Sequence, residues 1–230
     1  MPMAETPEST SQALRPVRVW DGAVRLSHWL IVALVAFSWW SAGENLTWHR
    51  WSGYAVIGLL VFRVWWGFTG GGAARFTSSL RGPATLLSYL RTVGRRDVST
   101  TPGHNPLGAI SVVALLLVLA AQVGTGLFVV DVDAFDGGPM SDRVSFETGR
   151  AIAEIHETIF RVLQALVALH VVAVVYYLVW KRTDLITPMI TGVKKLATDP
   201  GFAPARLWAF VVGVGIAGAV AWALSKGLRF

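Results

Sequence analysis

The chain has 230 residues, of which 53% are hydrophobic and 15% are charged, and its formal net charge is +6 at pH 7. A composition this apolar excludes an ordinary soluble domain and is typical of a protein that crosses a membrane several times. The sequence contains no cysteine, which excludes disulfides, thiolate metal sites and iron–sulfur clusters ligated by this chain.

The N-terminal segment, residues 1–14, is polar and lacks the cationic stretch that precedes the apolar core of a signal peptide. We therefore expect a disordered cytoplasmic tail, assigned to residues 1–16, and a first membrane span that inserts without cleavage. Beyond this tail the sequence has no low-complexity tract and no internal repeat.

Five apolar segments have roughly the ~20 residues that a transmembrane helix needs. They are residues 26–42, 51–68, 107–130, 151–180 and 207–224. Asn105 and Pro106 precede the third segment in the order of an N-cap residue and a first-turn proline. The sequence thus predicts an all-α integral membrane protein, in which a four-helix bundle is followed by a fifth, C-terminal transmembrane helix.

The loops between these segments differ in charge, which predicts their orientation. Cationic residues flank the first segment and fill the second and fourth loops: Arg15, Arg18 and Arg25; Arg75, Arg81, Arg91, Arg95 and Arg96; Lys181, Arg182, Lys194, Lys195 and Arg206. The third loop is acidic, with Asp131, Asp133, Asp136, Asp142 and Glu147 against Arg143 and Arg150. We therefore expect a cytoplasmic N-terminus, an outer loop over residues 131–150 and a periplasmic C-terminus.

Two histidines, His156 and His170, lie fourteen residues apart on the fourth apolar segment. Fourteen helical residues span about 21 Å and return to within about 40° of the same face. Both imidazoles should therefore point the same way, near opposite faces of the membrane. Ionisable side chains at this depth are costly, which favours a functional role.

Two further spans each offer one histidine at a matching depth, which pairs His28 with His170 and His49 with His156. Two imidazole pairs, one above the other, are the axial ligands that two stacked haems need. Because the chain has no cysteine, these would be non-covalent b haems. Bis-histidine iron has no open coordination position, which favours electron transfer. The alternative for any single histidine is a polar contact between helices.

Several motifs in the first four segments resemble the bacterial cytochrome b-561 family, which includes the cytochrome b subunits of nickel–iron hydrogenases. They are V-W-D at 19–21, R-L-S-H-W at 25–29, W-H-R-W-S-G-Y at 48–54, F-R-V-W-W-G-F at 62–68, G-H-N-P-L-G at 103–108 and T-G-L at 125–127. His156-Glu157 followed by His170 repeats the spacing of the family's fourth helix. The resemblance covers about residues 17–185, and the fifth span looks like that of the short five-span members.

This resemblance implies a four-helix bundle that binds two b haems and exchanges electrons with quinone. Its ligand pattern falls on His28, His49, His156 and His170. Arg25 and Arg63, at the cytoplasmic membrane edge, would pair with haem propionates, because arginine binds carboxylates bidentately. The alternative for these two arginines is ordinary positive-inside anchoring.

His104 lies in a loop motif rather than in a span, so we do not count it as a ligand. By depth, His104 and Asn105 lie near the haem of His170, which makes them candidates for a quinone pocket. The helix cap described above is the simpler role for Asn105, and we favour it.

Together these observations predict electron transfer across the bacterial inner membrane between the quinone pool and a redox partner on the outer face. The partner would be a periplasmic c-type cytochrome or the iron–sulfur subunit of a hydrogenase-like complex. A quinone-linked superoxide oxidase is a third alternative, which leaves open whether the chain is an enzyme. We expect contact with membrane lipid and none with nucleic acid. The domains would be the haem-binding core, residues 17–185, and a cytoplasmic loop with the fifth helix, residues 186–230.

Overall fold

The computed structural model describes residues 14–79, 82–96, 101–130 and 137–229. Within these ranges, five helices are long and apolar enough to cross a membrane. They are α1 (Gly22–Glu44), α2 (Leu46–Thr69), α5 (Pro106–Gly126), α6 (Phe146–Val179) and α8 (Leu207–Ser225). The five predicted spans and the all-α class are thereby confirmed.

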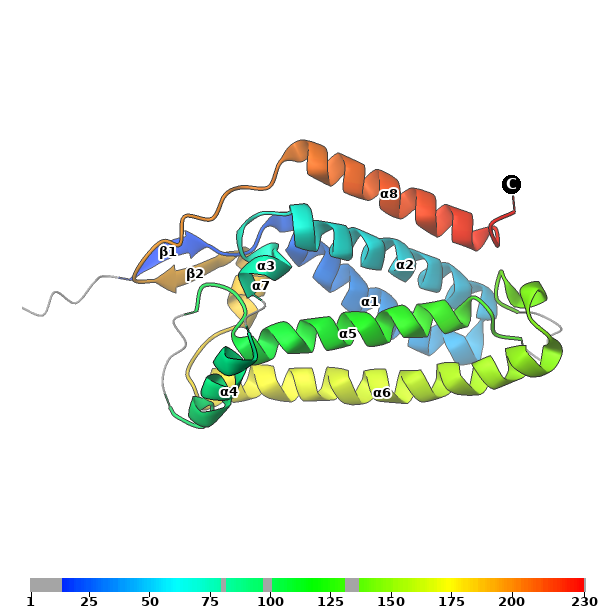
Figure 1. Ribbon diagram of the computed structural model, residues 1–230, viewed down its shortest axis with the longest axis horizontal. Coiled ribbons are helices and arrows are strands. Elements are labelled where there is room, and N and C mark those ends of the chain that lie inside the picture. Colours follow the sequence, from blue (N-terminus) through cyan, green and yellow to red (C-terminus); the bar gives the residue numbers. More distant parts are fainter. Residues whose placement is uncertain (1–13, 80–81, 97–100, 131–136, 230) are drawn as a thin grey trace, which may run out of the picture.

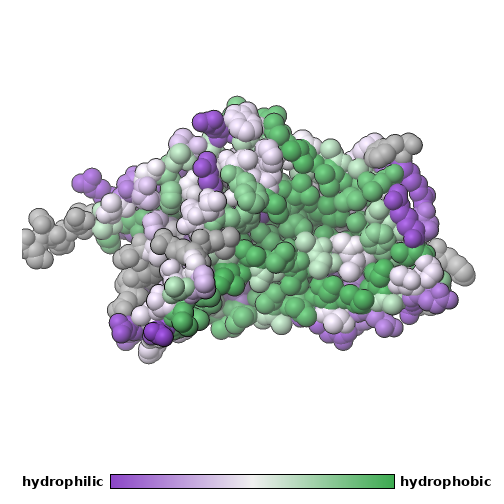
Figure 2. Space-filling model, viewed as in Figure 1, coloured by the Kyte–Doolittle hydropathy of each residue, from purple (hydrophilic) through white to green (hydrophobic). Residues whose placement is uncertain are grey.

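The long helices run side by side along one axis (Figure 1). α1 packs on α2, α5 packs on α6, α2 also contacts α5, and α8 lies against α2. Hydrophobic side chains cover the middle of the molecule and hydrophilic ones gather at its two ends, as Figure 2 shows. This distribution is what a bilayer requires, because apolar surface faces the hydrocarbon and charges reach water at either end.

Short polar residues fix where the spans begin. Asp21 caps α1 by accepting from the Val24 N–H at 2.8 Å, and its carboxylate also accepts from the Trp66 indole N–H at 2.9 Å. Asn45 caps α2, and Asn105 accepts from the Gly108 N–H at 2.8 Å. Each cap supplies an acceptor for N–H groups that the helix itself cannot satisfy. The predicted cap at Asn105 agrees with this contact.

The third span ends earlier than the sequence suggests, at Gly126 rather than Val130. The chain turns sharply there, and Val130 forms an isolated β-bridge with Gly137. Gly138 packs its backbone directly on the carbonyl oxygens of Gly126 and Leu127, where a side chain would collide. This turn closes the end of the bundle on which α6 begins.

The opposite end carries elements that the hydropathy pattern does not predict. Strand β1 (Arg15–Arg18) pairs antiparallel with β2 (Val193–Leu196). The short helices of this end are η1 (Gly72–Ala74), α3 (Phe76–Ser79), α4 (Pro83–Thr92) and α7 (Ile186–Thr191). The predicted tail, residues 1–16, overlaps β1 by two residues, while residues 1–13 lie outside the described ranges.

Helix α8 docks on α2 through small residues. Ala209, Gly213 and Ala217 are buried on one face of α8, and the Trp65 indole N–H donates to the Ala209 carbonyl at 2.8 Å. A Cβ at Gly213 would lie 2.5 Å from Cδ1 of Trp65. Small residues allow close helix contact in membranes, where packing rather than the hydrophobic effect drives association.

Gly213→Leu should therefore weaken the contact between α8 and α2. We expect a loss of about 1–3 kcal/mol, typical of overpacking a tight contact, measured as a lower midpoint of thermal unfolding in detergent. Gly215→Leu is the matched control, because a Cβ at Gly215 meets nothing within 4 Å. Equal losses in both variants would contradict this packing.

Candidate functional site

The rings of His49 and His156 face each other across the bundle. His49 lies in the first turn of α2 and His156 in the first third of α6. Their ring centroids are 6.2 Å apart and their planes are nearly perpendicular, at 85°. Metal–imidazole bonds of about 2.0–2.1 Å put two axial nitrogens about 4 Å apart, and each ring centroid roughly 1 Å farther out. The observed separation fits a single metal ion held between the two rings.

A cavity of about 430 Å³ opens beside these two histidines, within the size range of ligand pockets. Four helices and the turn after α5 line it, with mainly apolar side chains; examples are Trp39, Ile57, Leu119, Phe160 and Leu163. Gly126 keeps space for the histidine, since a Cβ there would lie 3.1 Å from Cε1 of His156. A flat apolar cofactor with two axial imidazoles fits these surroundings.

Polar groups fix the orientation of both rings. Nδ1 of His49 lies 2.8 Å from the Ser38 carbonyl oxygen on α1, so its other nitrogen, Nε2, is left for a ligand. His156 contacts the Thr125 hydroxyl through Nδ1 and the Gln122 amide through Nε2, each at 3.0 Å. The Gln122 Oε1 is buried and has no hydrogen-bond partner among the described residues. An unsatisfied amide at the wall of the cavity indicates a site built for an additional group.

His28 and His170 lie on facing helices, α1 and α6, toward the other end of the bundle. Each is half-buried, and the two interact electrostatically. His28 also packs edge-on against Trp29, at 5.2 Å between ring centroids. His49 and His156 are thus in contact at one end of the long helices, while His28 and His170 lie on two helices toward the other end.

Arg63 is buried within α2, with only 8% of its surface exposed. Its guanidinium lies over the Phe76 ring, at 5.1 Å from the centroid, and its Nη1 has no hydrogen-bond partner among the described residues. A buried cation with unsatisfied donors is costly unless an anion pairs with it. Arg63 therefore has donor capacity for a carboxylate at the His28 end of the bundle.

Within the described residues, Arg25, unlike Arg63, already uses a guanidinium donor in a hydrogen bond within the protein. Its Nη1 donates to the Ile190 carbonyl in α7, while its buried Nε has no partner among the described residues. This contact joins the start of α1 to α7, next to the Trp29 indole N–H, which donates to the Met189 carbonyl at 3.2 Å. Arg25 thus has one donor left for an anionic group and already holds α7 in place.

His104 is buried in the loop before α5, with its ring 4.7 Å from that of Trp20. Burial, with smaller contributions from the charges of Arg63, His170 and His28, lowers the pKa of His104 to about 4. The imidazole is therefore neutral near pH 7. The cavity that it shares with Arg63 measures about 10 Å³, the volume of about one water molecule, so a quinone ring would need a wider opening there.

Sequence reasoning assigned no role to Ser38, Gln122 or Thr125, although Thr125 begins the T-G-L motif at 125–127. Gln122 is a polar amide inside an apolar span, and this is the signal that could have indicated it. Its approach to His156 depends on how α5 packs on α6, which is not visible in the sequence. Among the described residues no three His, Cys, Asp or Glu side chains form a metal-binding group, and a haem iron needs only two axial ligands.

Residues 19–192 match the family model described as prokaryotic cytochrome b561. The match spans α1, α2, α5 and α6 and ends before α8. No curated protein and no solved structure matches the chain.

Proposed function

The chain belongs to the prokaryotic cytochrome b561 family, and from this premise we propose that it carries electrons between the quinone pool and a periplasmic redox partner through two stacked b haems. Family membership and five apolar helices make it a multi-pass membrane cytochrome that binds haem b and transfers electrons across the membrane. Beyond this, we propose that the chain holds two haems, and we propose their ligands, the quinone and the partner. The observation that carries it is the contact between His49 and His156 beside the apolar cavity.

We assign the outer haem to His49 and His156, and the inner haem to His28 and His170. Bound haem supplies an iron that takes up and releases one electron. The four imidazoles would hold the two irons, two to each, and bis-histidine ligation favours electron transfer over oxygen binding. Arg63 and Arg25 would pair with propionates of the inner haem, and the unsatisfied Nη1 of Arg63 supports this role.

An apolar layer separates the two ligand pairs. Val56, Leu60, Leu119 and Leu163 are buried and pack together, and Leu163 lies midway between His156 and His170 on α6. Fourteen helical residues place the two pairs about 21 Å apart along the helix axis. This layer excludes water from the space that an electron would cross between the two ligand pairs.

The charge distribution supports an orientation with the inner haem toward the cytoplasm. The end that carries β1, β2, α4 and α7 is rich in arginine and lysine: Lys181 donates to the Arg95 carbonyl at 3.0 Å, and Lys194 to the Thr101 carbonyl at 2.8 Å. Cationic loops remain in the cytoplasm. The N-terminus would then be cytoplasmic and the C-terminus periplasmic. The predicted acidic residues Asp131, Asp133 and Asp136 lie outside the described residues.

Residues that follow α8 contact the described part of the turn between α5 and α6. Arg229 pairs with Asp142 at 2.5 Å, and Arg143 donates to the Gly227 carbonyl at 2.6 Å. Met140 of this turn is buried with Ile57 and Leu127 in a cluster against which Leu224 of α8 packs. These contacts join the end of α8 to the described part of the outer turn.

Haem stoichiometry tests the proposal first. Pyridine haemochrome analysis of the purified protein should approach two b haems per chain, extractable with acidified solvent because the chain has no cysteine to hold them covalently. Redox titration should resolve two one-electron low-spin components. A reproducible value of one haem per chain would contradict the two-site arrangement.

Electron transfer from a quinol and to a partner protein tests the direction of electron flow. A short-chain quinol should reduce both haems in proteoliposomes, and a soluble c-type cytochrome added outside should reoxidise them. Reduction of the haems by added superoxide would instead indicate a superoxide oxidase. Reoxidation only by a co-purified iron–sulfur protein would favour the hydrogenase-like alternative.

A further inference from the structure

His156 makes polar contacts through both ring nitrogens, and only one of them can bind iron. Nδ1 lies 3.0 Å from the Thr125 hydroxyl oxygen, and Nε2 lies 3.0 Å from the Gln122 amide nitrogen. Thr125 and Gln122 are three residues apart on α5, so they present to α6 from the same helix face. The chemistry of these two neighbours decides which nitrogen carries the proton.

The Thr125 hydroxyl uses its own hydrogen in a bond to a backbone carbonyl of α5. Its oxygen lies 2.9 Å from the carbonyl oxygens of both Ala121 and Gln122, which can only accept. The hydroxyl must therefore donate to a carbonyl and accept from His156. Nδ1 is thus the protonated nitrogen, and in a neutral imidazole the lone pair is on Nε2. The Gln122 amide N–H, which donates to Nε2, agrees with this tautomer.

His49 is arranged in the same way by a different group. Its Nδ1 donates to the Ser38 carbonyl at 2.8 Å, with the Ser38 hydroxyl at 3.1 Å. In both rings Nδ1 meets an oxygen on a neighbouring helix, which leaves Nε2 as the nitrogen for a ligand. The two ring planes lie at 85° to each other.

We propose that Thr125 is a positioning residue for the outer haem: its hydroxyl accepts the Nδ1 proton of His156, directs Nε2 at the iron and keeps this ring perpendicular to that of His49. The inference rests on the proposed function, because it requires that His49 and His156 bind haem. Iron would take the lone pair that Gln122 now contacts, while the contact with Thr125, at the other ring nitrogen, stays in place.

This role has two measurable consequences. A hydrogen bond from Nδ1–H makes the imidazole a stronger donor to iron, which stabilises the ferric form and lowers the midpoint potential. Perpendicular imidazole planes make the ferric low-spin EPR spectrum strongly anisotropic, with one dominant low-field feature. Parallel planes would give a rhombic three-line spectrum instead.

Thr125→Val tests the proposal, because valine keeps the shape of threonine and removes the oxygen. We expect the ratio of reduced to oxidised outer haem at a fixed potential to rise about fivefold, the effect of one hydrogen bond, which is about 40 mV for a one-electron couple. The strongly anisotropic EPR feature should shift, and the inner haem should titrate as in the unmodified protein. Thr125→Ser, which keeps the hydroxyl, should restore both properties.

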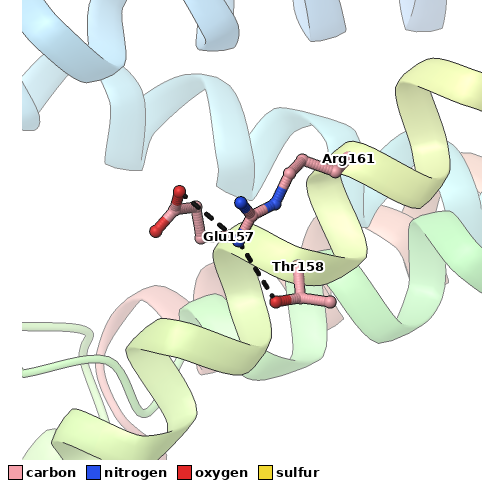
Figure 3. Close-up of polar contacts among 3 residues, drawn as sticks. All are labelled: Glu157, Thr158 and Arg161. Atoms are coloured by element: carbon pink, nitrogen blue, oxygen red, sulfur yellow. Dashed lines mark hydrogen bonds and ion pairs between the residues drawn. The ribbon is translucent and has the colours of Figure 1, made fainter.

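Thr158→Val is the matched control. Thr158 lies two residues from His156, but its hydroxyl accepts from Arg161 at 3.4 Å, and Arg161 also pairs with Glu157 (Figure 3). The same change at this position should leave both potentials and the EPR spectrum unchanged. If the valine at 125 prevents haem binding, Thr125→Ala removes the oxygen without steric demand and takes its place in the same measurements.

The outcomes separate this inference from the proposed function. Two haems with an unshifted outer potential and EPR spectrum in Thr125→Val, or a serine variant that behaves like the valine variant, would overturn the role of Thr125 alone. A rhombic EPR spectrum for the outer haem of the unmodified protein would overturn the perpendicular arrangement. A His49→Ala variant that keeps both haems would instead overturn the ligand assignment and the proposed function.

Discussion

His49→Ala and His156→Ala should each remove the same haem, and His28→Ala and His170→Ala should each remove the other. Loss of one axial imidazole leaves five-coordinate iron beside a new cavity, so haem affinity should fall by at least the 10–100-fold that changes around a metal ligand typically cost. Each variant should retain about one haem per chain by pyridine haemochrome analysis. Redox titration then identifies the haem that remains.

His104→Ala is the matched control for this set. His104 is a buried histidine at the inner end of the bundle and is assigned no iron, so its removal should leave two haems per chain. If His28→Ala retained the same haem as His156→Ala does, the pairing by depth would be wrong. If His104→Ala lost a haem, the ligand set itself would need revision.

Arg63→Gln should lower the midpoint potential of the inner haem. A buried positive charge beside a haem favours the reduced iron, and charge-assisted hydrogen bonds to a propionate are among the stronger contacts in proteins. We expect the ratio of reduced to oxidised inner haem to fall about tenfold at a fixed potential, which is about 59 mV for one electron. The measurement is a redox titration of both haems.

Two further variants test whether the charge of Arg63 causes the change in the midpoint potential of the inner haem. Arg63→Lys keeps the charge but loses the planar fork of donors, so its potential should lie between those of the unmodified protein and the glutamine variant. Arg161→Gln removes an exposed arginine that pairs with Glu157 at 3.5 Å, and should leave the inner haem unchanged. An effect of Arg63→Gln on the outer haem alone would contradict the assigned position.

The sequence determined the features that depend on local patterns. Apolar runs long enough to span a bilayer predicted all five long helices, because each transmembrane helix satisfies its own backbone hydrogen bonds and needs no partner to form. The cap at Asn105 was likewise readable, since it uses residues three apart. The spacing of His156 and His170 placed two imidazoles on one helix face, because helical periodicity is fixed.

Only the tertiary structure decided which side chains meet between helices. The approach of His49 to His156, and of Gln122 and Thr125 to the latter, depends on how α2, α5 and α6 rotate and pack against one another. The pairing of β1 with β2 joins segments almost 180 residues apart, and the docking of α8 on α2 depends on the fit of Gly213 to Trp65. Hydropathy cannot specify such contacts, because in a membrane the lipid-facing and helix-facing sides of a span are similarly apolar, and shape and polar pairing decide between them.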